Sequence, residues 1–181
     1  MSALPAPGTY AIDPVHSAVT FTARHLVAAK VRGSFTEFAG AVVIGDSAES
    51  SSVNATVEAG SITTHNEMRD GHLKSPDFFD LANHPTWTFT STSIKSKSGD
   101  DFELLGDLSI NGVTKPVTFN LEYLGTGPSM QEGVTVAGFE ASAEIDRRDF
   151  NVNFEGTLEN GSLVVSNKIV VTLEIEAAKQ G

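Results

Sequence analysis

Apolar and polar residues alternate along most of the chain, which is the pattern of a β-strand with one buried face. The alternation is clearest in residues 163–176, where Ile169, Val171, Leu173 and Ile175 are separated mainly by polar residues. Similar runs predict further strands at 17–25, 31–44, 53–59, 86–94, 102–110, 117–123 and 134–145. The pattern therefore predicts an all-β protein.

The breaks between these runs indicate how the strands are connected. Asn111-Gly112 separates two apolar-alternating runs, and this dipeptide favours a two-residue hairpin turn. The three-residue spacing of Phe35 and Phe38 predicts a bulge near Glu37, and Gly138 predicts a second bend. About eight strands in hairpin succession, with no internal repeat, favour an eight-stranded antiparallel up-and-down barrel without free edges. A β-sandwich is the alternative.

One stretch, residues 64–81, does not follow the strand pattern. Thr64 and Glu67 have the spacing of a helix capping box, and Gly71 is expected to end that helix. Ser75-Pro76 then predicts a second short helical turn. Phe78 and Phe79 lie in its apolar part, so we expect a short helical insert that acts as a lid over the barrel.

A barrel of eight strands is just wide enough to be filled by side chains or to hold one slender ligand. Several residues expected to face inward are alanines, which leave room unless large partners fill the space: Ala23, Ala55, Ala59, Ala141 and Ala143. Eleven phenylalanines, two tyrosines and one tryptophan suit either an apolar core or an apolar tunnel. Both possibilities stay open at this stage.

Charge and composition narrow the function classes. Twelve Lys and Arg against 23 Asp and Glu leave a net charge of −11, which disfavours nucleic acid and anionic membrane surfaces as partners. The sequence has no cysteine, so disulfides and thiolate metal sites are absent. Residues 1–8 are expected to form a flexible end and residues 9–181 one domain. The start of the sequence lacks the features of a signal peptide or membrane span, so we expect a cytoplasmic protein without stable membrane insertion.

Several ordered blocks together resemble the YceI-like polyisoprenoid-binding family, whose barrels are similar to those of lipocalins. The blocks are Asp13-Pro14-Val15-His16-Ser17, Gly33-Ser34-Phe35, Arg69-Asp70-Gly71-His72-Leu73, Ser75-Pro76-Asp77-Phe78-Phe79, the run 106–117 and Arg148-Asp149-Phe150. The resemblance implies a lipocalin-like barrel whose pore holds a polyisoprenoid lipid, such as a polyprenyl phosphate or an isoprenoid quinone. Asn151 stands where the resemblance predicts glycine.

Five histidines also raise a hypothesis from another class, a metal-dependent hydrolase or isomerase that uses His25, His65 or His72. The HExxH motif and the Gly-x-Ser-x-Gly motif are both absent. We therefore favour a non-enzymatic binding protein without cofactor, metal or catalytic residues. The Arg147-Arg148 pair offers a fork for a phosphate, although a surface pairing with Asp146 and Asp149 explains it equally well.

The predicted site follows from strand parity and the resemblance. The residues predicted to line the pore are Val19, Phe21, Phe35, Val57, Trp87, Phe89, Leu108, Phe119 and Phe139. The residues predicted near the polar end of the ligand are His25, Arg69, His72 and Arg148. Phe78 and Phe79 are predicted to contact the ligand or plug the mouth, with the insert as the gate. The sequence leaves a homodimer open.

Overall fold

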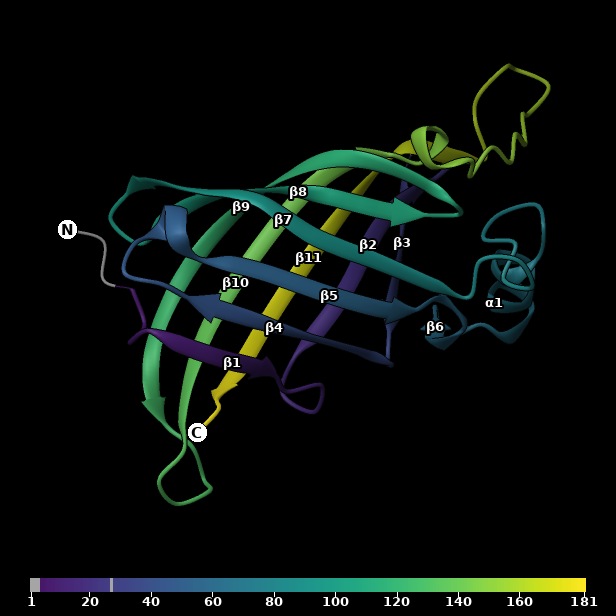
Figure 1. Ribbon diagram of the computed structural model, residues 1–181. Helices are drawn as coiled ribbons and strands as arrows, with labels where there is room; N and C mark the ends of the chain where they lie inside the picture. The colour runs from purple at the N-terminus through teal and green to yellow at the C-terminus, as the bar shows by residue number, and fades with distance from the viewer. Residues whose placement is uncertain (1–3, 27) are drawn as a thin grey trace.

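The computed structural model describes residues 4–26 and 28–181 and shows a closed β-barrel with one α-helix beside one end (Figure 1). The strands are β1 (Gly8–Ile12), β2 (Ala18–His25), β3 (Ala29–Phe35), β4 (Phe38–Ile44), β5 (Ser52–Glu58), β6 (Ile62–Thr63), β7 (Thr86–Ser98), β8 (Asp101–Ile110), β9 (Val113–Pro128), β10 (Thr135–Asp146) and β11 (Val165–Lys179). The helix α1 spans Glu67–Lys74, and short 3-10 turns η1 (Ala48–Ser50), η2 (Ala59–Ser61) and η3 (Arg147–Phe150) join strands. No helix in the described ranges is long and apolar enough to cross a membrane.

The barrel has eight strand positions because three of them are each made of two shorter strands. β1 and β2 both pair with β11, and β4 and β3 pair with β1 and β2 respectively. β5 and β6 occupy the next position, and β7 to β11 follow as antiparallel neighbours. The pairing of β1 with both β4 and β11 closes the ring. The predicted antiparallel up-and-down barrel is confirmed.

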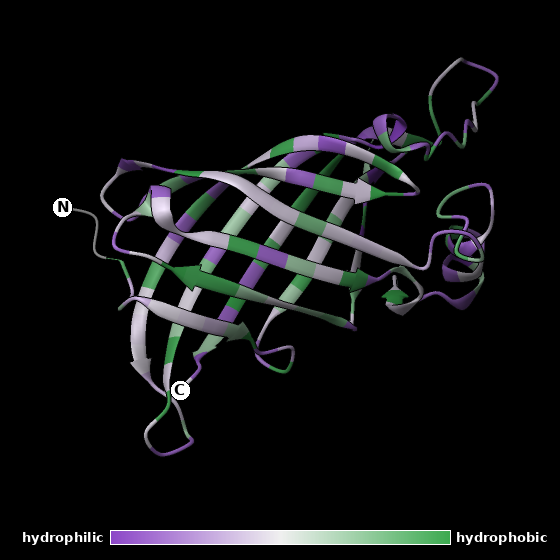
Figure 2. Cartoon of the chain, viewed as in Figure 1, coloured by the Kyte–Doolittle hydropathy of each residue, from purple (hydrophilic) through white to green (hydrophobic). Residues whose placement is uncertain are grey.

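Local backbone features account for the turns and bends of the barrel. Asn111 and Gly112 have φ angles of 51° and 73°, as a type I′ turn between β8 and β9 requires. The register of β10 against β9 shifts between Gly138 and Phe139, where the bend was predicted. At Thr36 and Glu37 the break is larger than the predicted bulge, because β3 and β4 are separate strands with different partners. The alternation of apolar and polar residues is visible along the strands in Figure 2.

The helical insert differs from its prediction in three respects. Asn66, rather than Thr64, caps α1 by accepting a hydrogen bond from the amide of Arg69. Gly71 lies within the helix, and Ser75 is its C-cap. Residues 76–79 form hydrogen-bonded turns and no second helix. The Thr64 hydroxyl instead donates to Asp70 Oδ1 at 2.6 Å, so a hydrogen bond to a side chain of α1 replaces the predicted bond to the backbone of the helix.

The described residues of the N-terminal segment pack on the barrel, although residues 1–8 were expected to be a free end. Leu4 packs against the hydrophobic core and Pro5 is buried. The hydroxyl of Tyr10 donates to the carbonyl oxygen of Ala6 at 2.8 Å. Residues 1–3 lie outside the described ranges. The barrel end near β1 is therefore closed in part by residues 4–8.

Candidate binding cavity

The barrel contains an apolar cavity with a volume of about 280 Å³. It is bordered by inward-facing residues of β2 to β5 and β7 to β11, and by Leu73, Phe78 and Phe79 of the insert. Its walls include members of two buried hydrophobic clusters, one that contains Tyr10 and Phe102 and one that contains Trp87 and Phe150. The cavity thus runs through the space that the two clusters enclose.

The cavity is long relative to its volume. On β11 its lining extends from Val165 to Ile175, ten residues along one strand. At about 3.4 Å per residue and a barrel tilt of about 40°, this run spans ~25 Å along the barrel axis. A volume of about 280 Å³ spread over that length is a narrow channel, which suits an extended chain better than a bulky ligand.

Aromatic rings form the cavity wall at the end of the barrel that faces α1. Phe35 meets Trp87 edge to face, with 5.1 Å between ring centroids, and Phe79 meets Trp87 in the same way at 4.7 Å. Phe21 lies 6.0 Å from Phe35. Such edge-to-face contacts hold rings in definite orientations. The insert therefore contributes Phe79 to a rigid aromatic wall.

All nine residues predicted to line the pore border this cavity, and so do Phe78 and Phe79. Among the inward alanines, Ala23, Ala55 and Ala141 also border it, whereas Ala59 and Ala143 are buried in the surrounding clusters. The small residues thus leave space that the large residues do not fill. Direct contact of each residue with a ligand stays a prediction.

The four polar residues predicted near the ligand's polar end do not line the cavity. Arg69 donates from Nε to the Thr64 hydroxyl at 2.7 Å and from Nη2 to the Thr64 carbonyl at 2.9 Å, which holds α1 to the end of β6. His72 bonds the Asp77 carboxylate at 2.8 Å and lies against Phe78 and Phe154. His25 ends β2 beside Val165 of β11. Their proposed contact with a head group stays a prediction.

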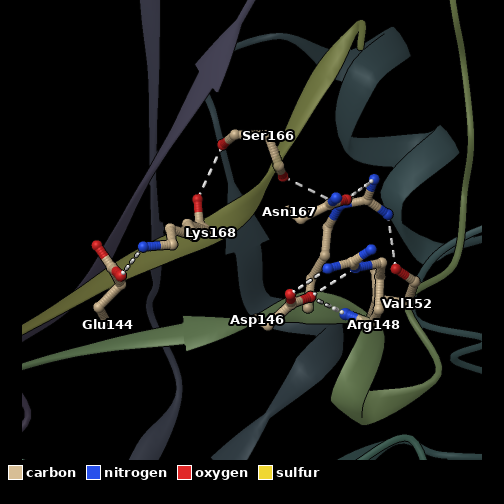
Figure 3. A network of polar contacts seen from close by, with 8 residues as sticks. Glu144, Asp146, Arg148, Val152, Ser166, Asn167 and Lys168 are labelled. Carbon is tan, nitrogen blue, oxygen red and sulfur yellow. Dashed lines mark hydrogen bonds and ion pairs between the residues drawn. The ribbon is translucent and has the colours of Figure 1, made fainter.

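Arg148 is part of an exposed ion pair with Asp146 (Figure 3). Its Nη2 donates to Asp146 Oδ2 at 2.6 Å and its Nε to Oδ1 at 2.9 Å. The Arg148 hydrogen bond, together with its backbone amide and positive charge, lowers the pKa of Asp146 to about 2. The surface pairing weighed in the sequence analysis accounts for Arg148.

Arg147, by contrast, is only 4% exposed and borders the cavity. In the sequence it is visible only as one half of an arginine pair. Strand parity contains the missing signal, because Ala141, Ala143 and Ile145 face inward at alternate positions and Arg147 is the next position in that series. The alternation continues from β10 into η3, and it places a cation on the inner side.

A second polar group lies outside the cavity, at the junction of β1, β2 and β11. His16 Nδ1 is 2.7 Å from Asp13 Oδ2 and 3.7 Å from Glu176 Oε1. The Asp13 hydrogen bond raises the pKa of His16, and the same bond lowers the pKa of Asp13. His16 is 63% exposed in its side chain, so the group is a solvated surface cluster. His25, His65 and His72 are not part of it.

Both the sequence and the fold of this chain are similar to those of known proteins. The model of the YceI-like domain matches residues 10–177. Protein YceI of Escherichia coli O17:K52:H18 is 41% identical over 138 residues, which cover 76% of this chain and 71% of that protein. The crystal structure of BcnA from Burkholderia cenocepacia superposes with a TM-score of 0.80 at 23% identity, covering 92% of this chain and 99% of BcnA.

A polyisoprenoid binding domain from Saccharophagus degradans has the same fold, with a TM-score of 0.65 at 16% identity and coverage of 94% of this chain and 98% of that domain. The two structural likenesses establish the barrel, and the family model together with the E. coli relative establishes the family. The ordered blocks on which the resemblance was based lie largely within the matched residues. The chain belongs to the YceI-like domain family.

Proposed function

We propose that this protein binds a polyisoprenoid lipid in the barrel and stores or transports it without chemical change. The observation that carries the proposal is the narrow, almost wholly apolar channel, whose lining contains one charged residue. A polyisoprenoid is a slender apolar chain and matches that shape. The Saccharophagus degradans domain, which has the same fold, is a polyisoprenoid binding domain, and this supports a polyisoprenoid as the ligand of the present barrel.

The energetics of burial favour a chain ligand over a small polar one. Burial of each CH₂ group contributes about 0.8 kcal/mol, so one five-carbon unit contributes up to ~4 kcal/mol before the costs of association. Those costs are about 4–15 kcal/mol, and a few units are enough to offset them. The apolar wall thus supplies affinity, while any polar contact serves mainly for selection.

The geometry favours binding over catalysis. His25, His65 and His72 lie outside the cavity lining, and they come from β2, the segment before α1 and α1 itself. His72 is engaged with Asp77 on the surface, and His65 is exposed. A reaction in the channel therefore has no histidine acid or base from these three residues.

We also propose that the protein is located in the cytoplasm.

Native mass spectrometry of the protein purified from its own host tests the proposal. A bound lipid whose mass and fragmentation match an isoprenoid supports it. A bound metal without lipid favours the hydrolase or isomerase alternative. A protein that carries neither, and that also fails to take up added polyprenol or quinone, contradicts lipid binding and favours a barrel used only as a binding module.

A further inference from the structure

Arg147 is a buried cation without a carboxylate partner among the described residues. Its Nε donates to the carbonyl oxygen of Ser166 at 3.0 Å and its Nη1 to that of Val152 at 2.6 Å. Its Nη2 donates to Asn167 Oδ1 at 3.0 Å. All three acceptors are neutral, so they satisfy hydrogen bonds without neutralising the positive charge.

The acidic groups near Arg147 offset its charge only in part, and neither forms an ion pair with it in the described structure. The Asp146 carboxylate bonds Arg148 through both of its oxygens (Figure 3). Burial lowers the pKa of Arg147, the charges of Asp146 and Glu155 oppose that shift, and the charge of Arg148 adds to it. An unpaired buried charge is costly, and proteins retain such a group mainly where it has a function.

The guanidinium also has unused donors. It carries five N–H groups, and three of them are engaged in the hydrogen bonds above. One N–H on Nη1 and one on Nη2 therefore remain without a partner in the described structure. Two neighbouring N–H groups of a guanidinium form the fork that receives two oxygens of a phosphate.

The position of Arg147 relates this fork to the cavity. Among the described residues, Arg147 is the only charged one in the cavity lining, and Val152, whose carbonyl accepts its hydrogen bond, lines the cavity as well. Trp87 borders the same end, and its buried indole N–H has no hydrogen-bond partner in the described part of the chain. Arg147 and Trp87 thus both offer donors at this end of the cavity lining, which suits a ligand end that accepts hydrogen bonds.

We propose that Arg147 binds a phosphate at the end of the lipid chain, so that the barrel selects a polyprenyl phosphate over an uncharged polyprenol or quinone. One phosphate oxygen accepts from the unused N–H of Nη1 and a second accepts from the unused N–H of Nη2, while the hydrogen bond to the Val152 carbonyl is kept. Such charge-assisted hydrogen bonds are shorter and stronger than bonds between neutral groups, which favours a phosphate at this fork. This inference rests on the proposed lipid-binding function and adds the orientation of the lipid, with its polar end toward η3 and α1.

The test compares geranylgeranyl phosphate with geranylgeraniol, two ligands with the same chain, by titration of the wild-type protein and two variants. We expect the wild type to prefer the phosphate by about tenfold or more, which is the range of a hydrogen bond to a charged group. Arg147→Met should remove that preference and leave alcohol binding within about twofold. Lys168→Met is the matched control, because Lys168 is an exposed cation paired with Glu144 outside the cavity, and it should keep the preference.

Two results overturn the inference. One is a wild-type protein that binds both ligands equally, a measurement that does not depend on how any variant folds. The other is an Arg147→Met protein that weakens both ligands by the same factor, which makes Arg147 a purely structural link between η3 and β11. If the wild type binds neither ligand nor a quinone, the proposed function itself fails, and that outcome differs from both of these.

Discussion

At the scale of single residues, the three consecutive side chains of Asp146, Arg147 and Arg148 have different environments at the end of β10. Asp146 and Arg148 pair on the outer surface, while Arg147 between them is buried at the cavity. Asp146 still has extended backbone and Arg147 follows it on the inner side, whereas Arg148 lies in the 3-10 turn η3, which returns it to the surface beside Asp146. Two neighbouring arginines thus have different roles: Arg148 forms a surface ion pair with Asp146, and Arg147 is a buried hydrogen-bond donor.

The Asp146–Arg148 pair predicts a pH dependence of stability. Because the folded pKa of Asp146 is about 2, below its usual 3.8, the folded chain binds fewer protons than the unfolded chain between these values. The stabilisation is fully present above pH 3.8 and is lost as the pH falls through about 2. The partner is half exposed, so solvent screening limits the effect to about 1 kcal/mol.

Asp146→Asn should therefore lower the melting temperature at pH 7 and flatten its fall between pH 5 and pH 2. Differential scanning calorimetry at several pH values measures both effects. Asp149→Asn, an exposed change in the same turn, is the control and should shift stability by less than about 0.5 kcal/mol. Parallel pH curves for the wild type and Asp146→Asn would contradict the assigned role of the pair.

Gly106 makes room for a cavity-lining ring. A methyl group at Gly106 would overlap the ring of Phe89 and lie 2.6 Å from the carbonyl oxygen of Thr90. Gly106→Ala should therefore destabilise the protein by about 1–3 kcal/mol, because the ring and the backbone must both shift. Urea unfolding measures the loss, and Gly127→Ala is the control, since a methyl group there meets no atom within 4 Å. Equal stability of the two variants would mean that Phe89 moves freely.

At the scale of elements, the insert consists of a helix without buried residues, followed by a turn that is partly buried. None of the residues of α1 is buried, and a helix of eight residues is not stable by itself. Phe79 in the turn is 9% exposed and packs on Phe35 and Trp87. Asn111 of the β8–β9 turn donates to the carbonyl oxygen of Phe78 at 2.7 Å. The buried apolar contacts of the insert thus come from its last residues, while Arg69 and Asp70 tie α1 to Thr64 through hydrogen bonds.

Phe78 and Phe79 have the same predicted role in the sequence, but they differ in burial. Phe79→Ala should cost about 3–5 kcal/mol, as expected for a buried aromatic side chain. Phe78 is half-buried and stacks with Phe154 at 4.8 Å in the loop after η3, so Phe78→Ala should loosen the mouth without unfolding the barrel. We expect faster lipid release from Phe78→Ala than from the wild type, measured by transfer of a fluorescent polyprenol analogue to acceptor vesicles.

The comparison of stability with exchange rate decides whether the insert is a gate. Urea unfolding of Phe78→Ala should give a free energy close to that of the wild type, while its release rate rises severalfold. Unchanged release from a folded Phe78→Ala protein would place the entry route elsewhere. A large loss of stability in that variant would make Phe78 ordinary core.

At the scale of the whole molecule, the proposed function depends on the open space of the channel. Ala141 lines it and is 5% exposed, with its neighbours Leu121 and Leu173 across the two adjacent strands. Ala141→Phe should fill part of the channel and abolish lipid uptake while the melting temperature stays within a few degrees, because the ring occupies existing space. Glu140→Phe adds the same ring on the exposed outer face and should bind lipid normally.

Native mass spectrometry and calorimetry on these two variants measure uptake and stability together. Lipid bound to Ala141→Phe at the wild-type level would show that the ligand lies outside the channel. Severe destabilisation of Ala141→Phe would show instead that the space is too small for one ring, and therefore too small for the proposed chain.

The alternation of residues, together with the family resemblance, predicted the antiparallel barrel, and it predicted most of the strands by itself. Period-two alternation is a local property of extended backbone, so it identified the inward face of β2, β7 and β9 without any long-range contact. The Asn111-Gly112 turn was equally local, because its positive φ angles depend on those two residues. Asn151, where the family resemblance predicts glycine, adopts φ 56° and the left-handed conformation that asparagine tolerates.

What only the tertiary structure decided lies where the chain leaves regular strands. The caps of α1 changed because Thr64 is held by Asp70 and Arg69, contacts that compete with a local capping pattern. Parity puts Arg147 on the inner side, but its hydrogen-bond partners are known only once β11 lies beside η3 and supplies Ser166 and Asn167. Strand parity determines which side a residue faces, and it carries no information about the partners that a distant strand brings to a polar side chain there.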